Sequence, residues 1–214
     1  MTLSGLPVTR GQDSRAHGPG VGTRTLCPPP VDTESGRLGG ARWCPSPHRD
    51  ARPDPADISL VVVHGISLPP GEFGGDWIDA LFTGALPTDA HPYFSGIAGM
   101  RVSSHVLIRR DGEYVQYVPF RERAWHAGVS SFGGRQDCND YAIGIELEGT
   151  DEDPYETVQY RRLAALCAAL IRAYPAVTED RIAGHCHVAP GRKTDPGPAF
   201  EWNRLRRLIR AVPA

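Results

Sequence analysis

The sequence lacks any long hydrophobic run, and no segment approaches the roughly 20 apolar residues that are needed to span a bilayer. The first 40 residues also lack the apolar stretch of a secretory signal. An excess of one charge is missing as well, because 23 basic and 25 acidic residues leave a formal net charge of −2. These absences argue against membrane association, signal-directed export and nucleic-acid binding.

Cysteine is scarce and irregularly placed. The five cysteines stand at positions 27, 44, 138, 167 and 186, an odd number without the spacing of a disulfide framework. This usage favours a reducing compartment, so the predicted location is the cytoplasm. Nothing in the sequence indicates an oligomeric state.

Two regions differ in composition. Residues 1–40 are rich in Gly, Pro, Ser, Thr and Arg and show no apolar periodicity, so they are predicted to form a disordered N-terminal extension. A start site assigned too far upstream would explain the same segment. The chain has 214 residues, 40% of them hydrophobic, which is enough for one core, and a single domain is expected over residues 41–214.

The patterns of that domain predict an α/β fold with a mixed central β-sheet flanked by helices. The β-branched run at 59–63 and the apolar run at 141–147 are typical of buried strands. An Asp-Gly turn at 111–112 predicts a hairpin between 102–109 and 113–118. Helices are expected at 76–86, 154–174 and 199–212, the second with apolar residues every three or four positions.

The loop from 184 to 198 is the most informative segment. It places His185, His187, Lys193 and Asp195 on a short stretch interrupted by Pro and Gly. His and Asp are suitable zinc ligands, and a nearby Lys can stabilise negative charge. In an extended segment His185 and His187 would share one face and could bind a metal together, although His187 could equally be exposed.

A catalytic zinc site needs three protein ligands and an open position. His64 follows a predicted buried strand, at the strand end where functional side chains often emerge in α/β sheets. It could join His185 and Asp195, but a lone His there is often only a hydrogen-bonded wall residue. Lys193 could likewise be an ordinary solvated loop residue.

Glu146 and Glu148 are unexpected in an apolar strand. Residues two apart lie on the same face of a strand, so both carboxylates leave the sheet on one side. A carboxylate in this position is costly unless it is paired or functional. It could be a general base that deprotonates a metal-bound water, or it could be paired with an Arg; the sequence favours neither.

Taken together, these motifs resemble the zinc-dependent N-acetylmuramoyl-L-alanine amidases of the type-2 amidase and peptidoglycan-recognition fold. The similarity is greatest to the cytosolic members that act on 1,6-anhydromuropeptides. It extends in order from about residue 42 to 212. The matching stretches are Ser46-Pro47-His48, Val61-Val62-Val63-His64, residues 66–75, His91-Pro92-Tyr93-Phe94, 108–113, 124–131, 139–151 and 184–198.

The resemblance implies one Zn²⁺ per chain, bound by His64, His185 and Asp195. It implies that Glu146 is the base and proton shuttle and that Lys193 supports the transition state. Tyr93 corresponds to a tyrosine near the metal. The positions expected to contact the substrate are Arg101, Trp125, His126 and Arg192.

The function implied is hydrolysis of the bond between the lactyl group of (1,6-anhydro)-N-acetylmuramic acid and L-alanine, for peptidoglycan recycling. A non-catalytic peptidoglycan-binding module and an exported autolytic amidase are the alternatives on the same fold. Two positions depart from the family pattern. Gly65 replaces an Asn directly after the first ligand, and His187 replaces an Asp two residues after the second.

Overall fold

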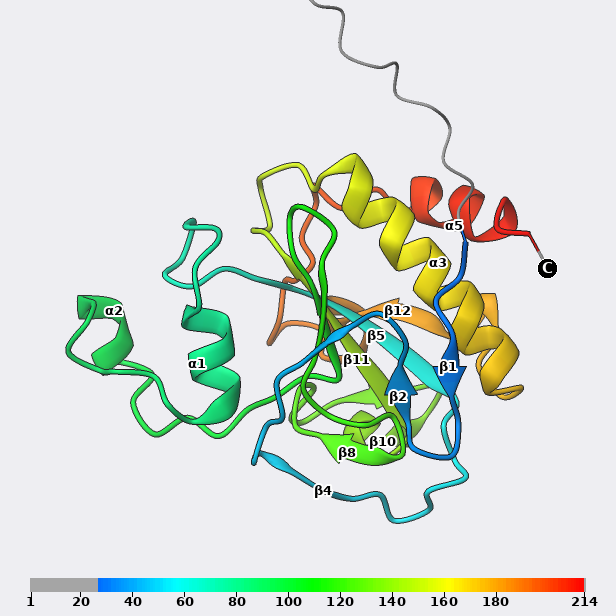
Figure 1. Ribbon diagram of the computed structural model, residues 1–214, viewed down its shortest axis with the longest axis horizontal. Helices are drawn as coiled ribbons and strands as arrows, with labels where there is room; N and C mark the ends of the chain where they lie inside the picture. Colours follow the sequence, from blue (N-terminus) through cyan, green and yellow to red (C-terminus); the bar gives the residue numbers. More distant parts are fainter. Residues whose placement is uncertain (1–26, 214) are drawn as a thin grey trace, which may run out of the picture.

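The computed structural model describes residues 27–213. A six-stranded mixed sheet forms its centre (Figure 1), with strand order β12-β5-β11-β6-β7-β3. The first four of these strands are parallel, β7 is antiparallel to β6, and β3 is parallel to β7. The bounds are β3 Arg42–Trp43, β5 Leu60–Ile66, β6 Val106–Ile108, β7 Tyr114–Gln116, β11 Ala142–Glu148 and β12 Ile182–Gly184.

Short two-stranded pairs and helices complete the structure. The pairs are β1 (Val31–Asp32) with β2 (Arg37–Leu38), β4 (Arg49–Ala51) with β8 (Glu122–Ala124), and β9 (Ser131–Phe132) with β10 (Arg135–Gln136). The helices are α1 (Trp77–Thr83), α2 (Pro92–Ser95), α3 (Thr157–Ala173), α4 (His185–Val188) and α5 (Trp202–Arg210). Single 3₁₀ turns cover Cys138–Asp140 and Glu179–Arg181. The predicted α/β class, hairpin and three helices are therefore confirmed, with shorter bounds than the sequence suggested.

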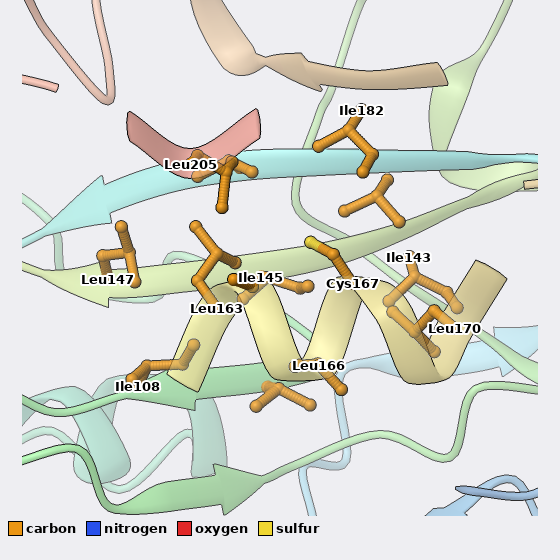
Figure 2. Packing of buried hydrophobic residues seen from close by; sticks show 14 of the residues in the cluster. Ile108, Ile143, Ile145, Leu147, Leu163, Leu166, Cys167, Leu170, Ile182 and Leu205 are labelled. Carbon is orange, nitrogen blue, oxygen red and sulfur yellow. The ribbon is translucent and has the colours of Figure 1, made fainter. Parts of the chain in front are cut away.

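One face of the sheet is covered by α3 and α5 (Figure 1). Apolar residues of α3 recur every three or four positions, so they form one stripe that packs on the sheet (Figure 2). Gln159 fixes the start of the helix: its amide oxygen accepts a hydrogen bond from the Glu156 N–H, and its nitrogen donates to the carbonyls of Ile108 and Glu148. The helix is thereby fixed to the ends of two strands.

Alternation along the strands sends different side chains to the other face. In β11, Ile143, Ile145 and Leu147 enter the core beneath α3, so Glu146 projects to the opposite side. In β5 the same alternation places His64 on that opposite side. The face away from α3 therefore carries His64 and Glu146, alongside two smaller apolar clusters.

Residues 27–40 differ from the prediction of a disordered segment to residue 40. They contain the β1–β2 hairpin, and Leu38 is buried in the core cluster beside α3. Gln116 holds the hairpin, because its side chain accepts from the Leu38 N–H and donates to the Gly36 carbonyl. The burial of Leu38 and these two hydrogen bonds stabilise the hairpin, although the segment has no apolar periodicity. The earlier part of the predicted extension lies outside the described residues.

The five cysteines all lie within the described range, and none of them forms a disulfide there. Among the helices of residues 27–213, none has the length and apolar character needed to cross a bilayer.

Candidate metal centre and cavity

Three parallel strands bring the candidate residues to one edge of the sheet. His64 lies near the end of β5 and pairs in register with Glu146 of β11. Strand β12 ends at Gly184 beside Val63, and His185 follows immediately as the first residue of α4. Because parallel strands present their carboxyl ends at the same edge, residues far apart in sequence meet there.

His64, His185 and Asp195 converge on one point. The Nδ1 atoms of the two histidines are 3.0 Å apart. The Oδ2 atom of Asp195 lies 3.1 Å from Nδ1 of His185 and 3.2 Å from Nδ1 of His64. The three atoms thus form a nearly equilateral triangle, and within residues 27–213 this is the group of His, Cys, Asp or Glu side chains arranged to hold a metal ion.

The triangle fits a tetrahedral Zn²⁺ ion. Ligand bonds of about 2.0–2.1 Å imply separations of about 3.3 Å between ligand atoms, close to those observed. Three lone pairs directed at one point repel each other unless a cation or proton lies between them. Two imidazole nitrogens and a carboxylate with one side open are the donor set of a catalytic rather than a structural site.

The outer nitrogens of both histidines have partners that select the required tautomer. Nε2 of His185 lies 3.2 Å from the Ala127 carbonyl and can only donate to it, which leaves Nδ1 free to bind a metal. Nε2 of His64 lies 2.9 Å from Nδ1 of His126. When His64 donates in that contact, its Nδ1 is likewise a free lone pair.

Burial and nearby charge shift the pKa values of His64 and Asp195. Burial lowers the pKa of His64 to about 4, although Asp195 opposes the shift, so His64 is neutral at neutral pH. Burial by itself would raise the pKa of Asp195, but its close contacts with His185 and His64 outweigh it and hold that pKa well below its usual range. The site therefore presents a neutral imidazole at His64 and a carboxylate at Asp195.

The two glutamates of β11 have different environments. Glu148 accepts hydrogen bonds from the backbone N–H groups of Gly74 and Arg110 and lies 3.8 Å from Arg109, so it is a structural carboxylate. Glu146 is equally buried but is in no ion pair of the described residues. Burial, and then the charge of Asp195, raise its pKa well above the ordinary value, while Lys193 acts in the opposite direction. A carboxyl group whose protonated form is favoured in this way is suited to accepting and returning a proton.

Lys193 is the single lysine of the sequence, in which the other 22 basic residues are all Arg. It lies two residues before Asp195 and lines the same cavity as Glu146. An ammonium group on a flexible stem is a compact point charge, unlike the planar guanidinium. Lys193 therefore supplies a mobile positive charge beside the metal-binding residues.

A cavity of about 470 Å³ opens over the three ligands. Its walls come from the segment after β5, from α1 and α2, and from the segment around Trp125 and His126. Tyr93 lines the wall from α2 and is 45% exposed. Trp125 is held by a hydrogen bond from Nε1 to Asp50. Tyr93, Trp125, His126, Glu146 and Lys193 are thus brought together, as the sequence led us to expect.

Other candidate residues lie elsewhere. Arg101 is outside the lining of the cavity, over the Trp125 ring at 5.7 Å. Arg192 is also outside the lining and donates to the carbonyls of Ala127 and Val129. His187 is exposed, because 185–188 is helical rather than extended, so the possibility that it shares a metal with His185 is wrong. Its Nδ1 accepts from the Gly184 N–H instead.

Two further contributors have no signal in the sequence. The Ala127 carbonyl orients His185, but a backbone acceptor carries no residue-type signal. Tyr155 lies behind the metal-binding residues and was expected only as part of a helix. Its buried hydroxyl follows from tertiary packing, which periodicity does not describe.

Comparison with known proteins agrees with this geometry. Residues 54–198 match the family model described as "N-acetylmuramoyl-L-alanine amidase". The chain is 64% identical over 176 residues to the "1,6-anhydro-N-acetylmuramyl-L-alanine amidase AmpD" of Citrobacter freundii, covering 82% of this chain and 94% of that protein. It is 62% identical to the protein of the same name from Escherichia coli K12, covering 82% and 96%.

Solved structures resemble the chain as well. A crystal structure of a Se-Met AmpD derivative superposes with a TM-score of 0.80 at 64% identity, covering 82% of this chain and 97% of that one. The amidase AmiD from E. coli, in complex with anhydro-N-acetylmuramic acid-L-Ala-D-gamma-Glu-L-Lys, superposes with a TM-score of 0.52 at 29% identity. In that case the match covers 71% of this chain and 57% of AmiD.

Proposed function

The chain belongs to the N-acetylmuramoyl-L-alanine amidase family and is an amidase that acts on muropeptides. On this basis we propose which bond the enzyme cleaves, which metal ion it binds and where in the cell it acts. The bond cleaved joins the lactyl group of 1,6-anhydro-N-acetylmuramic acid to L-alanine. One Zn²⁺ per chain is held by His64, His185 and Asp195. The setting is peptidoglycan recycling in the cytoplasm. The proposed bond agrees with the name "1,6-anhydro-N-acetylmuramyl-L-alanine amidase" of the relatives that match most of this chain.

One observation carries this proposal. The three donor atoms of the metal-binding triangle face a cavity that also contains Glu146 and Lys193. A cavity of about 470 Å³ lies within the usual range for small-molecule sites. Its size suits a sugar joined to a short peptide, which is the kind of molecule bound by AmiD.

The chemistry follows from the placement of these groups. Bound Zn²⁺ supplies a Lewis acid that polarises the amide carbonyl and lowers the pKa of a water molecule. Glu146 accepts the proton of the attacking water and returns it to the nitrogen of L-alanine as the C–N bond breaks. Lys193 stabilises the negative charge that develops on the carbonyl oxygen. The products are the free lactyl carboxylate and a peptide with a free L-alanine amine.

The other cavity residues bind and orient the substrate in this proposal. Tyr93 and Trp125 offer aromatic surfaces to it, and His126 completes the wall next to His64. Arg192 shapes the rim by holding the carbonyls of residues 127 and 129. Arg101 lies behind Trp125, where its charge can act on an anionic part of the peptide. No nucleic acid or membrane takes part.

Removal and return of the metal test the proposal. Dialysis against a chelator is expected to abolish cleavage of an anhydromuropeptide, and one equivalent of Zn²⁺ per chain is expected to restore it. Full activity of protein shown to be metal-free would contradict the zinc site. Binding of the peptide without cleavage by the zinc-loaded protein would instead support a non-catalytic binding module.

A further inference from the structure

Tyr155 lies in the segment between β11 and α3, outside every motif that pointed to the metal-binding site. Its side chain is buried, with 4% of its surface exposed. The hydroxyl donates a hydrogen bond of 3.0 Å to the carbonyl of Pro196, the residue that follows Asp195. The tyrosine is therefore one residue away from a metal ligand, through the backbone.

The same side chain lies against the residue that follows another ligand. Gly65 comes directly after His64, and a Cβ atom built there would overlap the Tyr155 hydroxyl. A Cβ atom at Gly149, just after the end of β11, would overlap the edge of the Tyr155 ring. At both positions the tyrosine occupies the space that a Cβ atom would take.

These contacts join three segments of the site. The end of β5 carries His64, β11 carries Glu146, and the loop through Pro196 carries Asp195. A second backbone contact supports the loop, since the Cys186 N–H donates to the Asp195 carbonyl at 2.9 Å. That bond ties Asp195 to the α4 segment of His185. Tyr155 contacts both the Asp195 loop and the end of β5, where the Pro196 Cα also lies 3.6 Å from the Cβ position of Gly65.

We propose that Tyr155 is a positioning residue, which sets the distance between the His64 and Asp195 segments so that their donor atoms meet at 3.2 Å. The inference rests on the proposed zinc site and deepens it. It also gives Gly65 a physical role in this chain, where the absence of a side chain leaves room for the tyrosine hydroxyl.

The test compares Tyr155→Phe with Tyr114→Phe. Tyr114 is a matched control, because it is equally buried and its hydroxyl also donates to a backbone carbonyl, that of Arg162, away from the cavity. Zinc affinity of the full chain is measured by competition with a chromophoric chelator, and the Tm of each metal-free protein is recorded. Tyr155→Phe is expected to weaken zinc binding about tenfold or more, as loss of outer contacts at metal sites commonly does. Tyr114→Phe is expected to leave zinc affinity unchanged.

A double-mutant cycle provides the second arm. Without the hydroxyl, the nearest Tyr155 atom to a Cβ at position 65 would be Cζ at 3.6 Å, an ordinary contact. Gly65→Ala is therefore expected to weaken zinc binding strongly in the wild-type background and much less in the Tyr155→Phe background. This arm stays informative even if one variant has a lowered Tm, because both backgrounds are compared in metal affinity.

The outcomes separate the inference from the proposed function. If the wild type binds zinc and Tyr155→Phe binds it equally well, or loses no more affinity than Tyr114→Phe, the positioning role is wrong. The same holds if Gly65→Ala has equal effects in both backgrounds. If the wild type itself binds no zinc, the proposed function fails, and the inference fails with it.

Discussion

At the residue scale, β11 shows why chemistry could be predicted only in part. The sequence predicts that Glu146 and Glu148 lie on one face of the strand. It does not indicate whether either carboxylate is functional or is paired with an Arg. The structure separates them, because Glu148 receives two backbone N–H groups and Glu146 receives none. The loop that packs over the end of a strand is determined by tertiary structure. The alternation of residues along one strand does not predict which loop that is.

Glu146→Gln tests this separation, with Glu148→Gln as the matched control on the same strand. Removing the proton acceptor is expected to lower kcat by about 10²–10⁴ while zinc content stays at one per chain. Glu148→Gln is expected to keep kcat near the wild-type value and to lower the Tm, because it weakens the hold on Gly74. The measurements are steady-state kinetics, metal analysis and thermal unfolding. Similar kcat values for the two variants would remove the assigned role of Glu146.

The buried histidines predict a pH dependence of stability. Burial lowers the pKa of His64 to about 4 and that of His105 well below its ordinary value of 6.5. Below about pH 6.5 the folded state thus binds fewer protons at these histidines than the unfolded chain does. The contribution of these residues to the free energy of unfolding is fully present above pH 6.5 and is lost as the pH falls toward 4. For His64 alone this contribution is on the order of 3 kcal/mol.

The expected result is a Tm of the metal-free protein that falls as the pH is lowered from 6.5 to 4. The raised pKa of Glu146 has the opposite effect on stability. The folded state favours the protonated form of this residue, so its contribution to stability increases as the pH falls. The fall should therefore be steeper in the Glu146→Gln background. A Tm that stays constant or rises on acidification in that background would contradict the assignment of neutral buried histidines.

At the element scale, the long elements were predicted and the short ones were not. The apolar periodicity of α3 and the β-branched run of β5 are strong local signals, and both elements lie where expected. Helix α4 is a single turn, so His185 and His187 looked like neighbours on an extended segment. Residues 31–38 lacked any periodicity, yet they form a hairpin through contacts with β7 and α3 that lie far away in sequence.

Leu38→Ala tests whether that hairpin belongs to the folded domain. Leu38 is 3% exposed within the main core cluster, so truncation is expected to lower the free energy of unfolding by about 2–5 kcal/mol. Urea unfolding measures the change, with an exposed residue of the same hairpin, Glu34→Ala, as the control. A loss below about 0.5 kcal/mol, the range of surface substitutions, would show that this segment contributes nothing to stability.

At the scale of the whole molecule, the two faces of the central sheet have different roles. The face under α3 and α5 holds the core, and the other carries His64 and Glu146 at the ends of parallel strands. α1 and α2 lie away from α3 and α5 (Figure 1) and contribute to the cavity wall. In the proposed function, the strand ends of the sheet hold the candidate metal ligands, and the cavity beside them receives the substrate.

The most direct measurement of the central claim is the mass of the products formed from one defined anhydromuropeptide by protein loaded with one zinc per chain. The account predicts two products, 1,6-anhydro-N-acetylmuramic acid with a free lactyl carboxylate and the intact peptide with a free L-alanine amine. Together they add up to the mass of the substrate plus one water. An uncut substrate, or cleavage at any bond other than the one between the lactyl group and L-alanine, would contradict it.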